Sequence, residues 1–387
     1  MTVRRTWDVF CSVVDNFGDA GVAWRLARQL VAEHGRDVRL LIDLLPVLAR
    51  IAPEVDPGRP SQSVHGVTIA LWQGPHAPML HAGAASAVVE AFGCGLPAGY
   101  LDAMQALREP PAWINLEYLS AERWVDDYHA LPSPQPQGGL SRHFFFPGFT
   151  VQSGGLLREN GLLATRDAFQ ADASARAALW RSLSLAPPDD DRLLVSLFAY
   201  ANPRLPALLD AWAEGEHRVC CIVPEGVASG EIDRWSGGAV PHPGQTLERG
   251  RLALIGIPFV AQEIYDRLLW ASDLNLVRGE DSLVRALWAG RPVAWQPYPQ
   301  AADAQRAKLD AFLSRYSDRM PAALAARYDG WVRAWNGGLD DDSAGTMWEA
   351  LAADLPALRG HALGWSAELA LQPDLTARLV TMADRLV

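Results

Sequence analysis

Two aspartates flank a Phe-Gly pair near the start of the chain, in the stretch DNFGD that begins at Asp15 and ends at Asp19. Two carboxylates can together grip a fork-shaped cation and accept a proton from it. The preceding run WDVFCSVV, residues 7–14, is short and apolar, which is typical of a buried strand. Apolar residues recur at helical spacing from Val22 onward. Residues 15–21 are therefore predicted to form a strand-to-helix loop at the ligand-binding edge of a parallel sheet.

A second acidic loop, RGEDS, is predicted between a buried strand over residues 273–277 and a helix that opens at Leu283. A loop before a helix directs backbone N–H groups and the helix dipole toward a ligand, an arrangement that suits a diphosphate. Glu280 and Asp281 would repel phosphate, so they fit better as partners of sugar hydroxyls or of a cation. Ser282, Arg278 and the backbone would then hold the phosphates.

Both loops also have purely structural interpretations. Asp19 could be an N-cap, Asp15 could close an Asx turn, and Asp281 or Ser282 could cap the later helix. The position of both loops at equivalent strand ends of two Rossmann-like halves favours a function, because facing domains would place them across one cleft. Neither loop carries a GxGxxG sequence, which argues against ordinary dinucleotide binding.

Composition narrows the class of protein. The chain has 387 residues, 49% hydrophobic and 20% charged, which is typical of a globular protein with two domains. A formal net charge of −11 argues against general binding to nucleic acid or anionic membrane. No apolar run is long enough to span a bilayer and no signal pattern precedes the first strand, so we expect a cytoplasmic protein. The four cysteines are expected to be buried thiols, and the histidines have no metal-ligand spacing.

The order of strand and helix patterns predicts an α/β fold with two Rossmann-like domains facing a cleft. The turn-rich segment LAPPDDD, residues 185–191, separates residues 1–185 from residues 186–387. The Pro/Gly/Ser segment at residues 131–139 is expected to be an exposed loop without regular structure. The helical stretch from about Trp331 could pack back across the cleft.

Several longer motifs resemble one family, the EarP protein-arginine rhamnosyltransferases that modify bacterial elongation factor P. The resemblance rests on WDVFCSVVDNFGDAGVAWRLARQL, on FFFPGFT followed by GGLLRE, on LFAY, and on the long run that begins IPFVAQEIYDRLLW and ends QPYPQ. It implies the two-domain GT-B fold, dTDP-L-rhamnose as donor substrate, inversion at the anomeric carbon, no metal and no further cofactor. It also implies elongation factor P as the protein partner, modified on one arginine and thereby activated.

The resemblance also assigns roles to residues. Asp19 matches the family's proposed general base, while Asp15 and Glu280 match acids that orient the guanidinium group or the sugar. In this assignment Asp15 grips a guanidinium that is otherwise a poor nucleophile, because its pKa lies above about 12. The first domain would bind the acceptor and the second the nucleotide sugar. The residues expected to bind the donor are Asn16, Phe17, Gly18, Phe198, Tyr200, Phe259, Gln262, Tyr265, Arg278, Gly279, Asp281, Ser282 and Tyr298.

Two alternatives stay open at this point. One is a GT-B enzyme with another sugar donor or a small-molecule acceptor. The other is a non-catalytic sensor of nucleotide sugars, which would bind the donor without turnover. Each aromatic residue of the second half could also belong to the core, since buried rings are common there.

Overall fold

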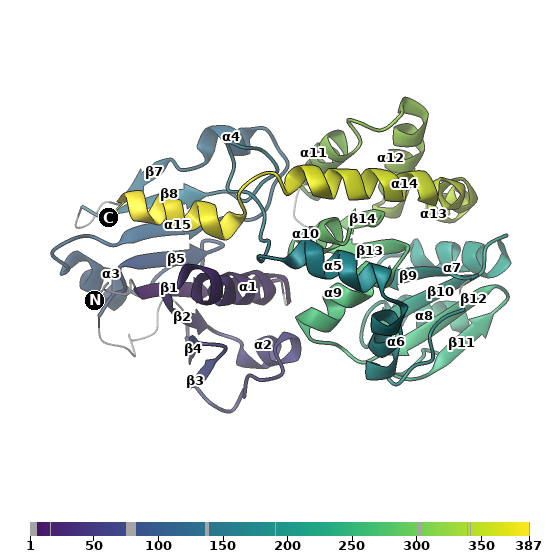
Figure 1. The fold of residues 1–387 in the computed structure, drawn as a ribbon, viewed down its shortest axis with the longest axis horizontal. Helices are drawn as coiled ribbons and strands as arrows, with labels where there is room; N and C mark the ends of the chain where they lie inside the picture. Colours follow the sequence, from purple (N-terminus) through teal and green to yellow (C-terminus); the bar gives the residue numbers. More distant parts are fainter. Residues whose placement is uncertain are drawn as a thin grey trace. The chain divides into compact units, whose positions relative to one another are not determined.

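A computed structural model describes residues 6–15, 17–74, 83–135, 139–189, 191–299, 304–338, 340 and 342–386. The chain divides into two compact units (Figure 1). Unit 1 comprises residues 1–160 and 370–387, and unit 2 comprises residues 161–369. Each unit is built on its own sheet.

Within the described residues of unit 1, eight strands form one sheet in the order β3-β4-β2-β1-β5-β6-β8-β7. Strands β1, β2, β4, β5, β6 and β8 are parallel, and β3 and β7 pair antiparallel at the two edges. The strands are β1 Thr6–Cys11, β2 Asp37–Ile42, β3 Ser61–Val64, β4 Val67–Leu71, β5 Ala87–Ala91, β6 Ala112–Leu116, β7 Pro132–Pro134 and β8 Ser141–Phe145. Strands β1, β5 and β6 are almost entirely buried and mainly apolar, and each carries one buried polar or charged residue, Asp8, Glu90 and Asn115 respectively.

The helices of unit 1 are α1 Phe17–His34, α2 Leu45–Ile51, α3 Ala98–Gln105, α4 Trp124–Tyr128 and α15 Leu375–Leu386. The helix α15 contacts α1 and β6, so residues 370–387 belong to the same unit as residues 1–160 (Figure 1). Its apolar residues Leu375, Leu379 and Ala383 recur every four positions and are buried, which explains why an amphipathic helix docks there.

Within the described residues of unit 2, six strands form one sheet in the order β11-β12-β10-β9-β13-β14. All neighbours pair in parallel except β11 with β12. The strands are β9 Leu193–Leu197, β10 Val219–Pro224, β11 Thr246–Arg249, β12 Leu252–Ile257, β13 Leu274–Arg278 and β14 Val293–Gln296. Cys220 and Cys221 lie buried on β10, and Cys11 lies buried on β1, so the prediction of buried thiols is confirmed for these three.

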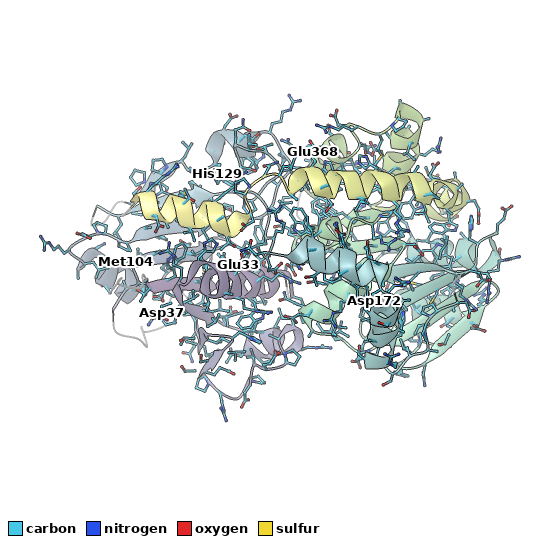
Figure 2. All side chains as sticks on the ribbon, in the orientation of Figure 1. Glu33, Asp37, Met104, His129, Asp172 and Glu368 are labelled. Carbon is cyan, nitrogen blue, oxygen red and sulfur yellow. The ribbon has the colours of Figure 1, made fainter. Side chains whose placement is uncertain are left out.

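The helices of unit 2 are α5 Leu162–Ala171, α6 Ala173–Ser182, α7 Leu205–Glu214, α8 Ser229–Ser236, α9 Gln262–Ala271, α10 Asp281–Ala289, α11 Ala304–Tyr316, α12 Ala322–Trp335, α13 Ser343–Thr346 and α14 Trp348–Leu369. Asp172, labelled in Figure 2, caps α6 by accepting a hydrogen bond of 2.7 Å from the Ser174 N–H. Among the described residues of this unit, eight tryptophans are buried in its helices or strands: Trp180, Trp212, Trp270, Trp288, Trp295, Trp331, Trp335 and Trp348.

The compact units differ in their boundaries from the expected domains 1–185 and 186–387. The change of unit falls between residues 160 and 161, because α5 and α6 pack on α9, and α5 also packs on α10, all within unit 2. Residues 370–387 belong to unit 1. The turn-rich segment at 185–191 is a connection within unit 2.

The expectation of a loop without regular structure over residues 131–139 is wrong for Pro132–Pro134. These residues form β7, which pairs antiparallel with β8. β7 lies at the edge of the sheet, where a missing proline N–H removes no ladder hydrogen bond from a further strand. Residues 136–138 lie outside the described residues.

Candidate functional site

In unit 1, the chain passes from β1 to β2 on one side and later returns to β5 on the other side of β1. The carboxyl ends of β1 and β5 therefore border a topological switch point, where open α/β sheets bind ligands. Asp15 and Asp19 follow β1 directly. The sequence-predicted acidic stretch thus lies at the edge of the sheet that the fold favours for binding.

Asp19 is a buried carboxylate with fixed geometry. Its side chain belongs to a residue only 2% exposed, and its Oδ2 accepts hydrogen bonds of 2.8 Å from the N–H groups of Val14 and Asp15. Burial raises the pKa of Asp19 above its usual range, the negative charge of Asp43 adds to the rise, and these hydrogen bonds together with one from Tyr118 oppose it. The net effect is a carboxylate that binds a proton more tightly than an ordinary aspartate.

The helix begins earlier than the sequence predicted. The helical spacing from Val22 onward had predicted a loop over residues 15–21, but α1 starts at Phe17, so Asp19 lies in its first turn. Glycine at position 18 has a packing reason, because a Cβ there would come within 2.9 Å of Asp15 Oδ2. The Gly18 N–H donates to the Asp15 carbonyl at 2.8 Å, which ties the two residues together.

Phe17, another predicted residue of this stretch, contacts a neighbouring helix. The ring of Phe17 lies under the guanidinium of Arg50 in α2, with 5.8 Å from Cζ to the ring centroid. Asn16 lies outside the described residues. The structure therefore brings Asp15, Gly18 and Asp19 together, while Phe17 contacts the neighbouring helix.

Two further polar residues of unit 1 were missed in the sequence. Asp43 follows β2 and accepts hydrogen bonds from Ser12 Oγ (2.5 Å) and from the Val13 N–H (2.9 Å). Tyr118 follows β6 and stacks on Phe92 at 4.5 Å between ring centroids, and it donates to Asp19. Both residues stand just past the carboxyl end of a strand, and that position was the signal that could have identified them.

Unit 2 repeats this arrangement. The chain runs from β9 to β10 and β12, then returns to β13 on the other side of β9, which places a switch point between β9 and β13. Phe198 and Tyr200 follow β9, Phe259 follows β12, and Arg278 ends β13. Tyr298 follows β14. All five predicted residues therefore lie past or at the carboxyl ends of parallel strands.

Aromatic rings gather at this edge around Phe198. Its ring centroid is 5.4 Å from that of Tyr265 in α9 and 6.4 Å from that of Phe259, in tilted contacts. Tyr200 and Tyr298 meet edge to face at 5.7 Å. Such rings present flat apolar faces that suit a planar base.

Arg278 contacts both the rings around Phe198 and the Tyr200–Tyr298 pair. Its Cζ lies 4.7 Å from the ring centroid of Phe198 and 4.6 Å from that of Tyr200. Contacts of a guanidinium with two rings are each worth about 0.5 to 2 kcal/mol, depending on solvent exposure. They fix the direction of a permanently charged group at the carboxyl edge of the sheet.

The second acidic loop is shorter than predicted. α10 begins at Asp281, so Asp281 and Ser282 lie in its first turn, with Glu280 at the N-cap. Gly279 adopts φ +64°, a conformation that favours glycine. Its N–H donates to the Gln296 carbonyl (3.1 Å) and its carbonyl accepts from Trp295 Nε1 (2.6 Å), so β14 holds the loop.

Side chains of the first turn of α10 meet α9. Gln262 Nε2 donates to Asp281 Oδ2 at 3.4 Å, and the buried hydroxyl of Tyr265 lies near Ser282. Burial raises the pKa of Tyr265 well above its usual range, so its hydroxyl stays protonated. Gln262, Tyr265, Asp281 and Ser282 thus lie together where α9 meets the first turn of α10.

Glu280 points elsewhere. Its carboxylate makes no capping hydrogen bond to α10, and its Oε1 lies 3.5 Å from Lys308 Nζ in α11. Gln296 was also missed, although its Oε1 accepts from the Tyr200 N–H at 2.9 Å. Gln296 opens the QPYPQ motif, but only Tyr298 of that motif was assigned a role, whereas Lys308 belongs to no recognisable motif and only the fold brings it to the loop.

Two general features of the described part of the chain bear on the chemistry. Among the described residues, no group of three or more His, Cys, Asp or Glu side chains is arranged to hold a metal ion. None of the helices in this part of the chain is both long and apolar enough to cross a membrane.

Comparison with known proteins identifies the family. The family model described as "Elongation-Factor P (EF-P) rhamnosyltransferase EarP" matches residues 7–384. The chain belongs to the EarP family. A protein-arginine rhamnosyltransferase of Pseudomonas putida is 48% identical over 384 residues, covering 98% of each chain. The EarP relative from Pseudomonas aeruginosa, with the same name, is 48% identical over 375 residues and covers 97% of this chain and 98% of its own.

Solved structures agree with this membership. The structure described as "Structural basis for EarP-mediated arginine glycosylation of translation elongation factor EF-P" is 38% identical, with a TM-score of 0.70, over 99% of this chain and 100% of the other. The kitacinnamycin glycotransferase, at 13% identity, has a TM-score of 0.51 over 99% of each chain, which bears on the fold alone. The resemblance to EarP seen in the sequence is confirmed, the fold class is GT-B, and the chain is a glycosyltransferase.

Proposed function

We propose that this EarP protein transfers L-rhamnose from dTDP-L-rhamnose to an arginine side chain of elongation factor P and thereby activates it. Relatives that share nearly half of their residues along the whole chain are named protein-arginine rhamnosyltransferases, which supports the acceptor and the sugar. The observation that carries the proposal is the buried carboxylate of Asp19, with its raised pKa, beside Asp15. The proposal includes the cytoplasmic location expected from the sequence.

The acceptor chemistry explains the need for paired acids. A guanidinium nitrogen is a poor nucleophile because its lone pair is delocalised and the group is protonated at neutral pH. In the proposal, Asp15 orients the guanidinium and Asp19 accepts a proton as the nitrogen attacks the anomeric carbon. A base with a raised pKa accepts that proton more readily, so the burial of Asp19 favours the transfer.

Unit 2 supplies the donor site in this proposal. The thymine ring would stack on the aromatic residues around Phe198, and the diphosphate would lie at the start of α10 near Arg278 and Ser282. One nitrogen–carbon bond forms as the bond from the anomeric carbon to the diphosphate oxygen breaks, which inverts that carbon. The leaving diphosphate gains charge, which Arg278 and the helix N-terminus stabilise without a metal ion. Glu280 orients the sugar.

The first prediction tests donor, acceptor and base together. Elongation factor P incubated with the protein and dTDP-L-rhamnose should gain the mass of one deoxyhexose, mapped to an arginine by fragmentation. Asp19→Asn should lower the rate by about 10² to 10⁴, because it removes the general base. Asp37→Asn is the matched control. This exposed aspartate lies at the amino end of β2, whereas Asp15 and Asp19 follow the carboxyl end of the parallel strand β1 (Figure 2).

A mass gain that is equal in Asp19→Asn and in the native chain would contradict the assignment of the base. If no mass gain occurs although dTDP binds, the acceptor is wrong. Screening dTDP-, UDP- and GDP-sugars would then separate another glycosyl transfer from a sensor without turnover.

The second prediction separates the two units. Phe259→Ala should weaken dTDP binding by roughly 1 to 3 kcal/mol, the usual value of a base–aromatic stack, as measured by isothermal titration calorimetry. Asp19→Asn should leave the same dissociation constant nearly unchanged, because it lies in unit 1. A loss of dTDP binding in Asp19→Asn as large as its loss of activity would refute the division of roles.

A further inference from the structure

One lysine stands out in the composition of this chain. Of the 34 lysine and arginine residues, 33 are arginine and Lys308 is the single lysine. It lies in the second turn of α11. Lysine differs from arginine in presenting a compact point charge, whereas arginine presents a planar fork that engages both oxygens of a carboxylate.

The partner of Lys308 is the acid that we assign to the sugar. Lys308 Nζ lies 3.5 Å from Glu280 Oε1, and the two side chains are 19% and 16% exposed. This pair is largely removed from water, so its attraction is screened less than that of a surface pair. Glu280 is the N-cap residue of α10 but its carboxylate does not cap that helix, in agreement with a side chain directed toward α11.

The backbone around both residues is held in place independently of the pair. Trp295 Nε1 donates to the Gly279 carbonyl at 2.6 Å, next to Glu280. The ring of Trp295 meets Phe312 of α11 edge to face at 5.4 Å. Phe312 follows Lys308 by four residues and so lies on the same face of the helix. Trp295 of β14 thus contacts both the loop that carries Glu280 and the helix α11 that carries Lys308. These contacts hold the two segments in place independently of the ion pair.

We propose that Lys308 is a positioning residue, which holds the Glu280 carboxylate in the orientation that the sugar of the donor requires. This inference rests on the proposed role of Glu280. Lys308 acts through Glu280 and needs no contact of its own with the substrate.

The first test uses the single lysine as its own probe and needs no substrate. Protein labelled with ¹³C at the lysine ε-carbon gives one lysine side-chain signal by NMR. Glu280→Gln should shift this signal. Asp310→Asn should leave it close to its native position, because Asp310 lies in the same helix but is held by Arg333 Nε at 2.9 Å. An unchanged signal in Glu280→Gln would overturn the proposal.

The second test asks whether Lys308 acts through Glu280. Lys308→Met should lower kcat by about tenfold, a coupling typical of residues in contact, and should change the affinity for dTDP by less than about twofold. In the Glu280→Gln background, Lys308→Met should cause no further loss. Losses that multiply in the double variant would overturn the positioning role.

The two tests also separate this inference from the proposed function. If the native protein transfers no rhamnose, the proposed reaction fails, while the NMR signal still decides whether the pair exists. If rhamnose is transferred but the activity losses of the two single variants multiply in the double variant, the proposed reaction is supported and the positioning role of Lys308 is refuted. If Lys308→Met keeps the native NMR signals of its other residues, its loss of activity is not caused by unfolding.

Discussion

Asp19 holds a negative charge where the fold disfavours it. Its carboxylate is buried and lies near Asp43, and two backbone N–H groups and Tyr118 compensate only in part, so its pKa is raised. A carboxyl whose pKa is raised in the folded state stabilises the protein when protonated and loses that contribution as the pH rises through the folded pKa. At neutral pH the ionised Asp19 therefore lowers the free energy of unfolding.

The raised pKa predicts that Asp19→Asn, which should be far less active, is more stable than the native protein. Asp19→Asn keeps an oxygen for the two N–H groups and removes the charge, so the melting temperature at pH 7 should rise by roughly 1 to 3 °C. The difference should be small near pH 4 and grow as the pH increases. Thermal unfolding of both proteins from pH 4 to pH 8 measures it. A constant difference over this range would mean that the charge is not the cause.

Sequence reasoning reached some of these residues and missed others for a clear reason. Asp15 and Asp19 follow a strand pattern directly, so their place at the edge of a sheet could be predicted from local sequence. The approach of Asp43 and Tyr118 depends on which strands are neighbours of β1, and one sequence does not specify that order. Lys308 has no motif, and it reaches Glu280 only because α11 packs against β14.

At the scale of elements, a buried ion pair fixes the helix that carries the second acidic loop. Arg285 of α10 donates from Nε to Asp266 Oδ1 (3.0 Å) and from Nη2 to Asp266 Oδ2 (2.7 Å) of α9. Both side chains are less than a tenth exposed. This two-point contact sets the rotation of α10 relative to α9, and therefore the direction of Ser282 in its first turn.

Breaking this pair on one side should be costly. Arg285→Met leaves the Asp266 charge buried, and we expect it to lower the free energy of unfolding by about 3 to 5 kcal/mol in urea titrations. The double variant Asp266→Leu/Arg285→Met should be more stable than Arg285→Met alone. Arg327→Met removes a two-point contact with Asp354 at the surface of the same unit, and its effect should be much smaller. Equal losses at the two sites would show that burial does not govern the cost.

Element boundaries were predicted less well than element types. The alternation of strands and helices in both halves follows the sequence, but α1 and α10 each begin before the predicted residue. Glycines and acids at a helix start resemble a loop in sequence. In the structure, Gly18 leaves room for the Asp15 carboxylate, while Asp19 and Asp281 lie in first turns, where the helix dipole favours negative charge.

At the scale of the whole molecule, the chain leaves unit 1 at residue 160 and returns to it at residue 370. The sequence indicated only that the helical stretch from about Trp331 could pack back; it did not identify α1 and β6 as the contacts of α15, because an amphipathic pattern requires an apolar partner without naming one. The turn-rich segment at 185–191 suggested a boundary by composition. The change of unit falls before α5, because α5 and α6 pack on α9 and a compact unit consists of elements that bury residues against one another.

The scarcity of lysine has a practical consequence for anyone who handles this protein. Reagents that acylate amines, including those that couple proteins to sensor surfaces or attach dyes, find one side-chain target, Lys308, besides the α-amino group. The Lys308 side chain is 19% exposed and its amine lies 3.5 Å from Glu280, so a label that reaches it would report on this part of unit 2. Lysyl endopeptidase, for the same reason, can cut the unfolded chain at one bond and yields two fragments that divide it within α11.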